Sequence, residues 1–341
     1  GERERFSAAP VGERDGFSPS LRVLVFGDFG ERTPKQARVA AAMAREHAAR
    51  PFDLALQLGD NVYRCGPDPV LPGAEGCRFA EDGNTVVAGY APPQDPLFER
   101  NEAPLRALRT AAGEPLPTWL ALGNHDLGAQ EGCDAPGLTR DGWMVRRACL
   151  AVAHRTPTWN QPARHYVLDR GPVRIIVVDT DPLVAPYGPF DAEAEIAFVR
   201  QAAEGCGERL CFLAGHHPPA QVSAAGRPAR RFQEAMARLL EAGGGRIAAF
   251  LGGHLHTLQH LERDGLDVLI AGSSARGKGD LFVSRWPDWA QKRFASTADG
   301  FGVLEAGAGG WRFRFVDAGG RPLHCCEASG RGPCRPAACK P

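Results

Sequence analysis

The chain has 341 residues, of which 43% are hydrophobic and 23% charged, so it can bury a sizeable core and is not disordered by composition. Its 40 basic residues balance 40 acidic ones, and a formal net charge of +0 argues against electrostatic binding of nucleic acid or anionic membrane as its main role. No apolar run approaches the ~18 residues that a membrane-spanning helix needs.

Short apolar runs alternate with helical patterns along the chain. The runs suit central strands that are buried on both faces, and they are residues 21–26, 53–58, 118–122, 173–178, 210–214, 247–251 and 266–271. Helices are predicted after Thr33-Pro34, an N-cap followed by a first-turn proline, and over residues 99–110, 192–203 and 229–241. A β-hairpin is predicted around residues 308–310. This alternation predicts an α/β sandwich.

No internal repeat or low-complexity linker divides the chain. We therefore expect one catalytic domain over residues 21–322. An N-terminal arm at residues 1–20 would precede it, and a cysteine-rich tail at residues 323–341 would follow it.

Five of the predicted strands end in a glycine that is followed at once by a carboxylate, amide or imidazole. The five turns read GDFG (27–30), GDNVY (59–63), GNHD (123–126), GHHP (215–218) and GHLH (253–256). An isolated histidine is more often a packing residue than a ligand. In open α/β sheets, however, ligands bind outside the carboxyl ends of strands, so these turns would bring their side chains together. The repetition predicts one shared site.

The residue types in the turns indicate a pair of transition-metal ions. Carboxylate, amide, phenolate and imidazole groups suit such metals, whereas an oxygen-only set would suit magnesium or calcium. Two metals about 4 Å apart, bridged by a carboxylate and a hydroxide, are the usual device for hydrolysing phosphate esters.

The blocks GDFG, GDNVY, GNHD, LAGHHP and GGHLHTLQ together resemble the metallophosphoesterase superfamily, and they occur in family order between Leu21 and Arg321. Tyr63 narrows the resemblance to the purple acid phosphatases, and within these to the small tartrate-resistant type, because these enzymes use a tyrosine at this position as a phenolate ligand of ferric iron. The resemblance implies a four-layer αββα sandwich with a binuclear metal site at the C-terminal ends of the strands.

The resemblance also implies a role for each residue of the turns. The first metal would be Fe(III), and the second would be Fe(II) or Zn(II), with manganese as an alternative. Asp60 would bridge the two ions. The other ligands would be Asp28, Tyr63 and His256 for the first metal, and Asn124, His216 and His254 for the second. His125 resembles the family histidine that contacts phosphate and protonates the leaving group.

Six further residues are candidates for supporting or substrate-binding roles. Asp126 and Gln259 would orient the metal ligands, and His217 and His260 would form the pocket wall. The loop at residues 272–280 would bring Arg276 or Lys278 to the pocket rim, with a solvated glycine-rich loop as the equal alternative.

The chain departs from the family at one place. Small members of the family often have another histidine after LAGHHP, where this chain reads Ala224-Ala225-Gly226-Arg227. Either His125 alone supplies the proton, or another residue of the pocket substitutes.

Ten cysteines without a CxxC spacing favour disulfides and an oxidising compartment, which predicts a secreted or periplasmic protein. Their sequence positions predict the pairs Cys65–Cys77, Cys133–Cys149 and Cys206–Cys211. The adjacent Cys325 and Cys326 would bond to Cys334 and Cys339 in an undetermined order.

The predicted function is hydrolysis of phosphate monoesters by attack of a metal-bound hydroxide. Alternatives are a phosphodiesterase or another phosphoester or phosphoanhydride hydrolase, and a catalytically silent secreted binding protein on the same scaffold. We expect a small phosphorylated substrate or a phosphoprotein as partner, no nucleic acid, no membrane span and a monomeric chain.

Overall fold

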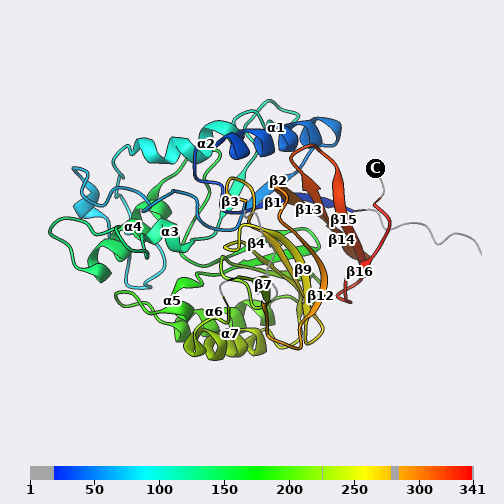
Figure 1. The fold of residues 1–341 in the computed structure, drawn as a ribbon. Coiled ribbons are helices and arrows are strands. Elements are labelled where there is room, and N and C mark those ends of the chain that lie inside the picture. The colour runs from blue at the N-terminus through cyan, green and yellow to red at the C-terminus, as the bar shows by residue number, and fades with distance from the viewer. Residues whose placement is uncertain (1–18, 225, 278–283, 340–341) are drawn as a thin grey trace, which may run out of the picture.

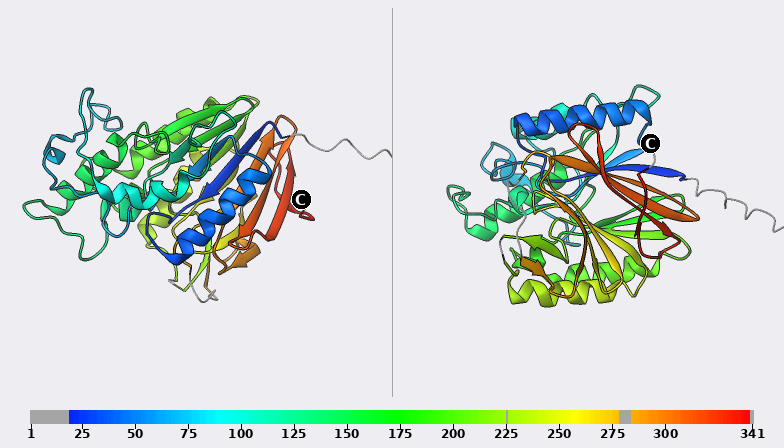
Figure 2. Two further views of the ribbon diagram at one scale, coloured as in Figure 1. Left: turned by 90° about the horizontal axis from the view of Figure 1, so that it is seen from above. Right: turned by 45° about the vertical axis from the view of Figure 1, so that its right-hand side comes forward.

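Two β-sheets pack face to face in the computed structural model, and helices cover their outer faces (Figure 1). The structure describes residues 19–224, 226–277 and 284–339. The resulting order of layers is helix, sheet, sheet, helix, and the two further views show the same arrangement (Figure 2). The four-layer αββα sandwich is therefore confirmed.

The first sheet is built from β1 (Leu21–Phe26), β2 (Leu54–Gln57), β3 (Thr118–Leu120), β13 (Gly300–Gly307), β14 (Gly310–Asp317), β15 (Pro322–Ser329) and β16 (Arg335–Pro336). Its strand order is β16-β15-β14-β13-β1-β2-β3, with β1, β2 and β3 parallel. The predicted hairpin is the antiparallel pair β13–β14. The cysteine-rich segment after Arg321 adds β15 and β16 to the sheet, although the sequence had indicated no strand there.

The second sheet is built from β4 (Tyr166–Arg170), β5 (Val173–Val177), β6 (Leu210–Ala214), β8 (Ile247–Gly252), β9 (Leu258–Arg263), β10 (Leu266–Ala271) and β12 (Gln291–Ser296). Its strand order is β12-β9-β10-β8-β6-β5-β4, and β5, β6, β8 and β10 run parallel. A small separate ribbon pairs β7 (Gln221–Ser223) with β11 (Ser284–Trp286). All seven predicted strands are present in these sheets.

The helices are α1 (Pro34–Ala49), α2 (Glu99–Leu105), α3 (Asn124–Leu127), α4 (Arg140–Ala153), α5 (Asp181–Val184), α6 (Ala192–Glu204) and α7 (Arg230–Ala242). Short 3₁₀ turns lie at Ala74–Gly76 and Pro96–Phe98. As predicted, Thr33 caps α1, and its hydroxyl accepts the N–H of Gln36. The sequence pattern missed α4. Among the residues described, no helix combines the length and apolarity needed to cross a membrane.

The alternation of side chains along β1 shows how the layers are held together. Val23 and Val25 belong to the core between the two sheets, where they join residues of β5 and β6 such as Ile175 and Phe212. Leu24 and Phe26 point the other way and pack with Val39 and Met43 of α1. Because both faces of β1 are buried, its run of six residues is entirely apolar except for Arg22.

Five disulfides use all ten cysteines. Cys206–Cys211 is confirmed, and the tail order is Cys325–Cys339 and Cys326–Cys334. The predicted pairs Cys65–Cys77 and Cys133–Cys149 are wrong. The bonds are Cys65–Cys133 and Cys77–Cys149, with Cα–Cα distances of 5.2 and 5.9 Å. The loop after β2 folds against the segment that follows β3, so Cys65 and Cys77 bond to cysteines 68 and 72 positions away rather than to each other.

Candidate metal centre

The five predicted turns converge at the carboxyl ends of strands from both sheets. Asp28, Asp60 and Asn124 follow β1, β2 and β3 of the first sheet, while His216 follows β6 of the second. His254 and His256 follow β8. The centre therefore lies where the two sheets meet, as expected for open α/β sheets.

One group of side chains surrounds the phenol of Tyr63, which is almost completely buried. Its oxygen lies 2.8 Å from Oδ2 of Asp60 and 3.1 Å from Oδ1 of Asp28. The Nε2 atom of His256 lies 3.3 Å from the same phenol oxygen and 3.2 Å from Oδ1 of Asp28. These four residues are the expected ligand set of the first metal.

A second group surrounds Nε2 of His216, another fully buried side chain. This atom lies 3.1 Å from Oδ1 of Asn124, 3.3 Å from Oδ1 of Asp60 and 3.3 Å from Nδ1 of His254. These four residues are the expected ligand set of the second metal. Asp60 belongs to both groups, with Oδ2 facing Tyr63 and Oδ1 facing His216.

The chemistry of these donors fits a pair of cations. Buried carboxylate and phenol oxygens of Asp28, Asp60 and Tyr63 converge in one group, and imidazole nitrogens of His216 and His254 face each other in the other. Without a metal, the carboxylate of Asp60 holds a proton on His216, whose pKa rises to about 10 even though burial opposes its charged form. A mixed oxygen and nitrogen set of this kind suits iron, zinc or manganese.

The backbone of the centre adopts a conformation that non-glycine residues rarely take. Asp28 and Asp60 both have φ of 56°, and His254 and His256 have φ of 73° and 47°. Among the described residues, Asp264 is the only other non-glycine residue with positive φ. Left-handed residues of this type are strained and cluster at functional sites, because the surrounding structure must hold them in place.

Three of the motifs need a glycine because atoms of another loop come very close to the backbone at that position. A Cβ atom on Gly59 would lie 2.6 Å from Nδ1 of His216, and one on Gly123 would lie 2.4 Å from Oδ1 of Asp60. A Cβ atom on Gly253 would lie 2.7 Å from Oδ2 of Asp28. Each glycine thus leaves room for a donor atom that comes from a different loop.

Hydrogen bonds orient the donor atoms. Nδ1 of His216 lies 2.8 Å from the carbonyl oxygen of Leu58, which can only accept, so a neutral His216 directs an unprotonated Nε2 at the centre. The carboxylate of Asp126 accepts N–H bonds from Asn61, Val62 and Gly123 at 2.8 to 2.9 Å. It therefore ties the loop after β2 to the loop after β3, next to Asp60 and Asn124.

His125 lies at the edge of the centre. Its Nδ1 is 2.6 Å from the carbonyl oxygen of Arg64, and its Nε2 is 4.0 Å from Oδ2 of Asp60. The backbone N–H of His125 donates to Oδ1 of Asp60 at 2.9 Å, so the residue is anchored independently of its ring. Burial lowers the pKa of the imidazole. The ring packs against Tyr63, with 4.3 Å between centroids.

Two of the supporting candidates lie beside the centre. Nδ1 of His217 is 2.8 Å from the hydroxyl of Thr180, and its ring centroid is 4.5 Å from that of His254. The guanidinium of Arg276 lies 4.3 Å above the ring of Tyr63 and forms an ion pair with Glu31. Lys278, the other candidate in that loop, lies outside the described residues.

Gln259 and His260, the remaining candidates for supporting roles, contact residues other than the predicted metal ligands. Gln259 exchanges hydrogen bonds of 2.8 Å with the backbone of Val222 and also donates to Thr257, so it holds β9 against β7. His260 lies between Asp267 and His324, at 2.8 and 2.9 Å. Its hydrogen bonds lead to the interface between the sheets rather than to the predicted ligands.

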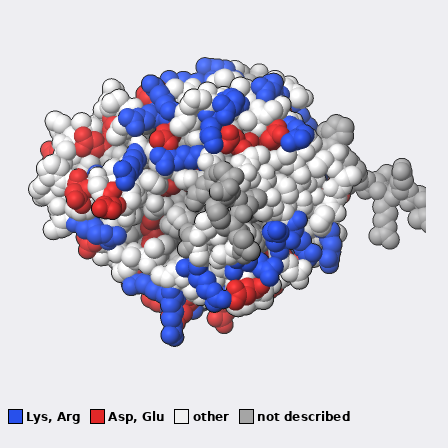
Figure 3. All heavy atoms as spheres, viewed as in Figure 1, with Lys and Arg blue, Asp and Glu red and all other residues white. Residues whose placement is uncertain are grey.

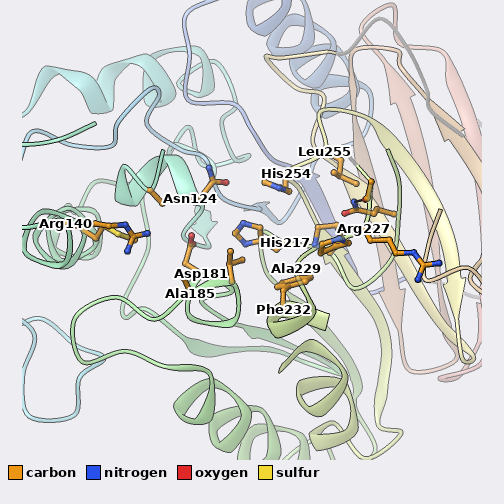
Figure 4. Close-up of a pocket in the computed structure, with 17 residues that line it drawn as sticks. Asn124, Arg140, Asp181, Ala185, His217, Arg227, Ala229, Phe232, His254 and Leu255 are labelled. Carbon is orange, nitrogen blue, oxygen red and sulfur yellow. Dashed lines mark hydrogen bonds between the residues drawn. The ribbon is translucent and has the colours of Figure 1, made fainter. Parts of the chain in front are cut away.

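A cavity of about 360 Å³ opens beside the second ligand group (Figure 4). Asn124, His217 and His254 line it, together with Asp181 at the start of α5. Asp181 was not predicted as a site residue, because the strand before it is followed by Val178-Asp179-Thr180-Asp181 without a glycine. The carboxylates at that strand end were the signal that could have indicated it.

Comparisons with curated proteins find acid phosphatases that are similar to most of this chain. The chain is 24% identical over 321 residues to tartrate-resistant acid phosphatase type 5 of Rattus norvegicus, a match that covers 89% of each chain. The enzyme of the same name from Mus musculus is 24% identical over 269 residues, covering 75% of this chain and 73% of the relative. No family model matches the chain.

Solved structures share the fold at low sequence identity. GAP50, described as the anchor in the inner membrane complex of Plasmodium, aligns with a TM-score of 0.66 at 14% identity, over 93% of this chain and 90% of its own. A purple acid phosphatase from yellow lupin seeds aligns with a TM-score of 0.61 at 14% identity, over 91% of this chain and 53% of its own. PhoD aligns with a TM-score of 0.58 at 13% identity, covering 96% and 73%.

Proposed function

We propose that this purple acid phosphatase-like metallophosphoesterase hydrolyses phosphate monoesters at a binuclear metal centre. The observation that carries the proposal is the position of Asp60, whose two carboxylate oxygens face two separate groups of donor atoms. Such a shared carboxylate is the arrangement that a two-metal phosphoesterase requires.

The first metal would be Fe(III), bound by Asp28, Asp60, Tyr63 and His256, because a buried phenol is a suitable ligand for ferric iron. The second would be Fe(II), Zn(II) or Mn(II), bound by Asp60, Asn124, His216 and His254. When bound, the two ions would neutralise the phosphoryl oxygens and lower the pKa of a water, ferric iron more than zinc, so we expect optimal activity below neutrality.

The residues of the chain itself would position the substrate and supply the proton. The carbonyl of Arg64 fixes the Nδ1–H tautomer of His125, which leaves Nε2 to carry a proton to the leaving-group oxygen. His217, fixed by Thr180, would line the path of the leaving group. Arg276, paired with Glu31, would lie at the phosphate side of Tyr63.

The substrate would be a small phosphorylated compound or a phosphoprotein, and the protein a monomer. Lys and Arg side chains are intermingled with Asp and Glu on the face shown in Figure 3, which gives no support to a nucleic-acid partner. The five disulfides fit an extracellular or other oxidising compartment, so we infer that the protein is secreted or periplasmic.

The test is an assay of the purified, metal-analysed protein on a panel of phosphate monoesters, phosphodiesters and pyrophosphate. We expect about two metal ions per chain, a pink to purple colour and monoester hydrolysis. If only the diesters are hydrolysed, the protein is a phosphodiesterase and the proposed monoesterase activity is wrong. Metal loading without turnover of any member would favour a catalytically silent binding protein. GAP50, which shares this fold, is described as an anchor.

A further inference from the structure

The cavity beside the second ligand group has an apolar wall. Met144 of α4, Val184 of α5, Phe232 of α7 and Leu255 after β8 contribute to it, together with Pro218. Its volume of about 360 Å³ falls within the range of cavities that enclose small organic ligands. The cavity shares Asn124, His217 and His254 with the metal centre, so a group held in it would lie next to the reacting phosphate.

The carboxyl group of Asp181 lines this cavity without a hydrogen-bond partner. Asp181 is 4% exposed, and neither of its carboxyl oxygens makes a hydrogen bond with any described residue. Oδ2 is fully buried, so Oδ1 is the oxygen that a ligand in the cavity would meet. Figure 4 shows the side chain of Asp181 at the cavity wall near Asn124 and His217. A buried carboxyl group without a partner destabilises the protein, and a ligand with a polar group at this position would supply the missing hydrogen bond.

The backbone of Asp181 is held in place by a buried ionic network. Its N–H donates to Oδ1 of Asp179 at 3.1 Å, and Oδ2 of Asp179 is bound by Arg164 at 2.8 Å and by the hydroxyl of Tyr187 at 2.6 Å. None of these contacts uses the Asp181 carboxyl group. The network therefore fixes the position of α5 while leaving that group available to a ligand.

We propose that this cavity binds the alcohol part of the substrate, and that Asp181 selects apolar alcohols or phenols carrying a second hydroxyl group. The proposal rests on the proposed phosphatase function, because the cavity selects the leaving group of the same reaction. Burial, together with Asp179, raises the pKa of the Asp181 carboxyl well above its usual range. A hydroxyl group suits the site in either protonation state, since it can both donate and accept.

Two arginines also line the cavity, and each pairs with an aspartate that is not part of the lining. Arg140 lies 3.9 Å from Asp141, and Arg227 forms an ion pair with Asp288. Among the described residues that line the cavity, Asp181 is the only acidic one, so its carboxyl group is the one that a hydroxyl group of the ligand would meet.

The test compares two phosphates that have the same shape, 4-(hydroxymethyl)phenyl phosphate and 4-ethylphenyl phosphate, on the full metal-loaded chain. We expect kcat/KM to favour the hydroxymethyl compound by about tenfold or more, because the ethyl group leaves the carboxyl group unpaired. In Asp181→Leu the ratio should fall to about one or below. Asp169→Leu, at a carboxylate on β4 that pairs with Arg174 outside the cavity, should keep the wild-type ratio.

Asp181→Asn is the second variant if the leucine variant does not fold, and it should keep part of the preference because the amide still forms hydrogen bonds. A ratio near one in the wild type, or a ratio that Asp181→Leu leaves unchanged, would overturn the proposal. If neither phosphate is hydrolysed, the proposed function has failed and the cavity is tested by calorimetry with the free phenols. Tighter binding of 4-(hydroxymethyl)phenol than of 4-ethylphenol, lost in Asp181→Leu, would support the site; equal binding or none would refute it.

Discussion

The phenol oxygen of Tyr63 lies 2.8 Å from Oδ2 of Asp60. If this phenolate binds ferric iron, ligand-to-metal charge transfer should colour the protein pink to purple. Tyr63→Phe should lose the visible band and keep the fold, because phenylalanine fills the same buried space. Tyr90→Phe, which removes only a hydrogen bond to the carbonyl of Gly73, should keep the colour. The visible absorption spectrum of each variant tests whether Tyr63 is the ligand that produces the colour. A colourless, iron-free and fully active wild type would contradict the ferric assignment.

Asp60→Ala removes the carboxylate that both ligand groups share. We expect the variant to bind fewer than two metal ions per chain and to lose turnover, because both sites lose a ligand at once. The measurement is elemental metal analysis after dialysis, with Asp169→Ala as the control for loss of a carboxylate elsewhere. Two tightly bound ions in Asp60→Ala would show that Asp60 is not the bridge.

His125→Ala should keep both metals while kcat falls by about 10²–10⁴-fold, the usual contribution of a general acid. The backbone N–H of residue 125, which donates to Asp60, survives this substitution. Esters with good leaving groups should be affected less than alkyl phosphates, because they need less protonation. Metal loss in this variant would assign His125 to the metal centre instead.

The disulfide Cys65–Cys133 closes a loop of 68 residues, and in the chain-entropy model such a closure stabilises the fold by about 4 kcal/mol. Replacing both cysteines with serine should therefore lower the Tm clearly. It should also weaken catalysis, because Cys65 follows Arg64, whose carbonyl orients His125. The matched control is replacement of Cys206 and Cys211. Their separation of 5 residues predicts that the free energy of unfolding falls by only about 2 kcal/mol. Calorimetry and peptide mapping of the unreduced protein check the effect and the pairing. Equal losses of Tm in the two double variants would contradict the loop-length argument.

Acid should destabilise the protein through His324 on β15. Burial, together with His260, lowers the pKa of His324 to about 4, whereas the unfolded chain would have the usual value near 6.5. The unfolded state therefore binds a proton that the folded state rejects, and stability falls as the pH drops from about 6.5 to 4. The loss should be smaller than the roughly 3 kcal/mol of the full shift, because the side chain is partly exposed to solvent. His324→Phe would keep the stacking on Phe294 and should flatten this part of the curve of Tm against pH. An unchanged pH dependence in the variant would refute the assignment.

The residues of the metal centre could be predicted because each of its motifs is a short, continuous stretch of sequence. Each strand end carries its own glycine and donor residue, and the carboxyl ends of the parallel strands of one sheet lie at the same edge. The disulfides of Cys65 and Cys77 were not predictable in this way, since their partners depend on how two long loops fold against each other. Asp181 and Thr180 were not predicted for a related reason. Asp181 lines the cavity to which α4, α5 and α7 contribute, and Thr180 holds His217, which lines the same cavity. Helix α4 itself was not predicted.

The loops of the centre come from two different sheets, with Asp28, Asp60 and Asn124 on one and His216, His254 and His256 on the other. An unfolded chain could present only isolated pairs such as His254 and His256, so full metal affinity can appear only once the sandwich has closed. Metal uptake and the docking of the two sheets would then be thermodynamically linked, and each bound ion would stabilise the closed sandwich by a free energy that grows with the logarithm of its affinity. In refolding, the colour of the centre would therefore report when the two halves of the molecule have joined.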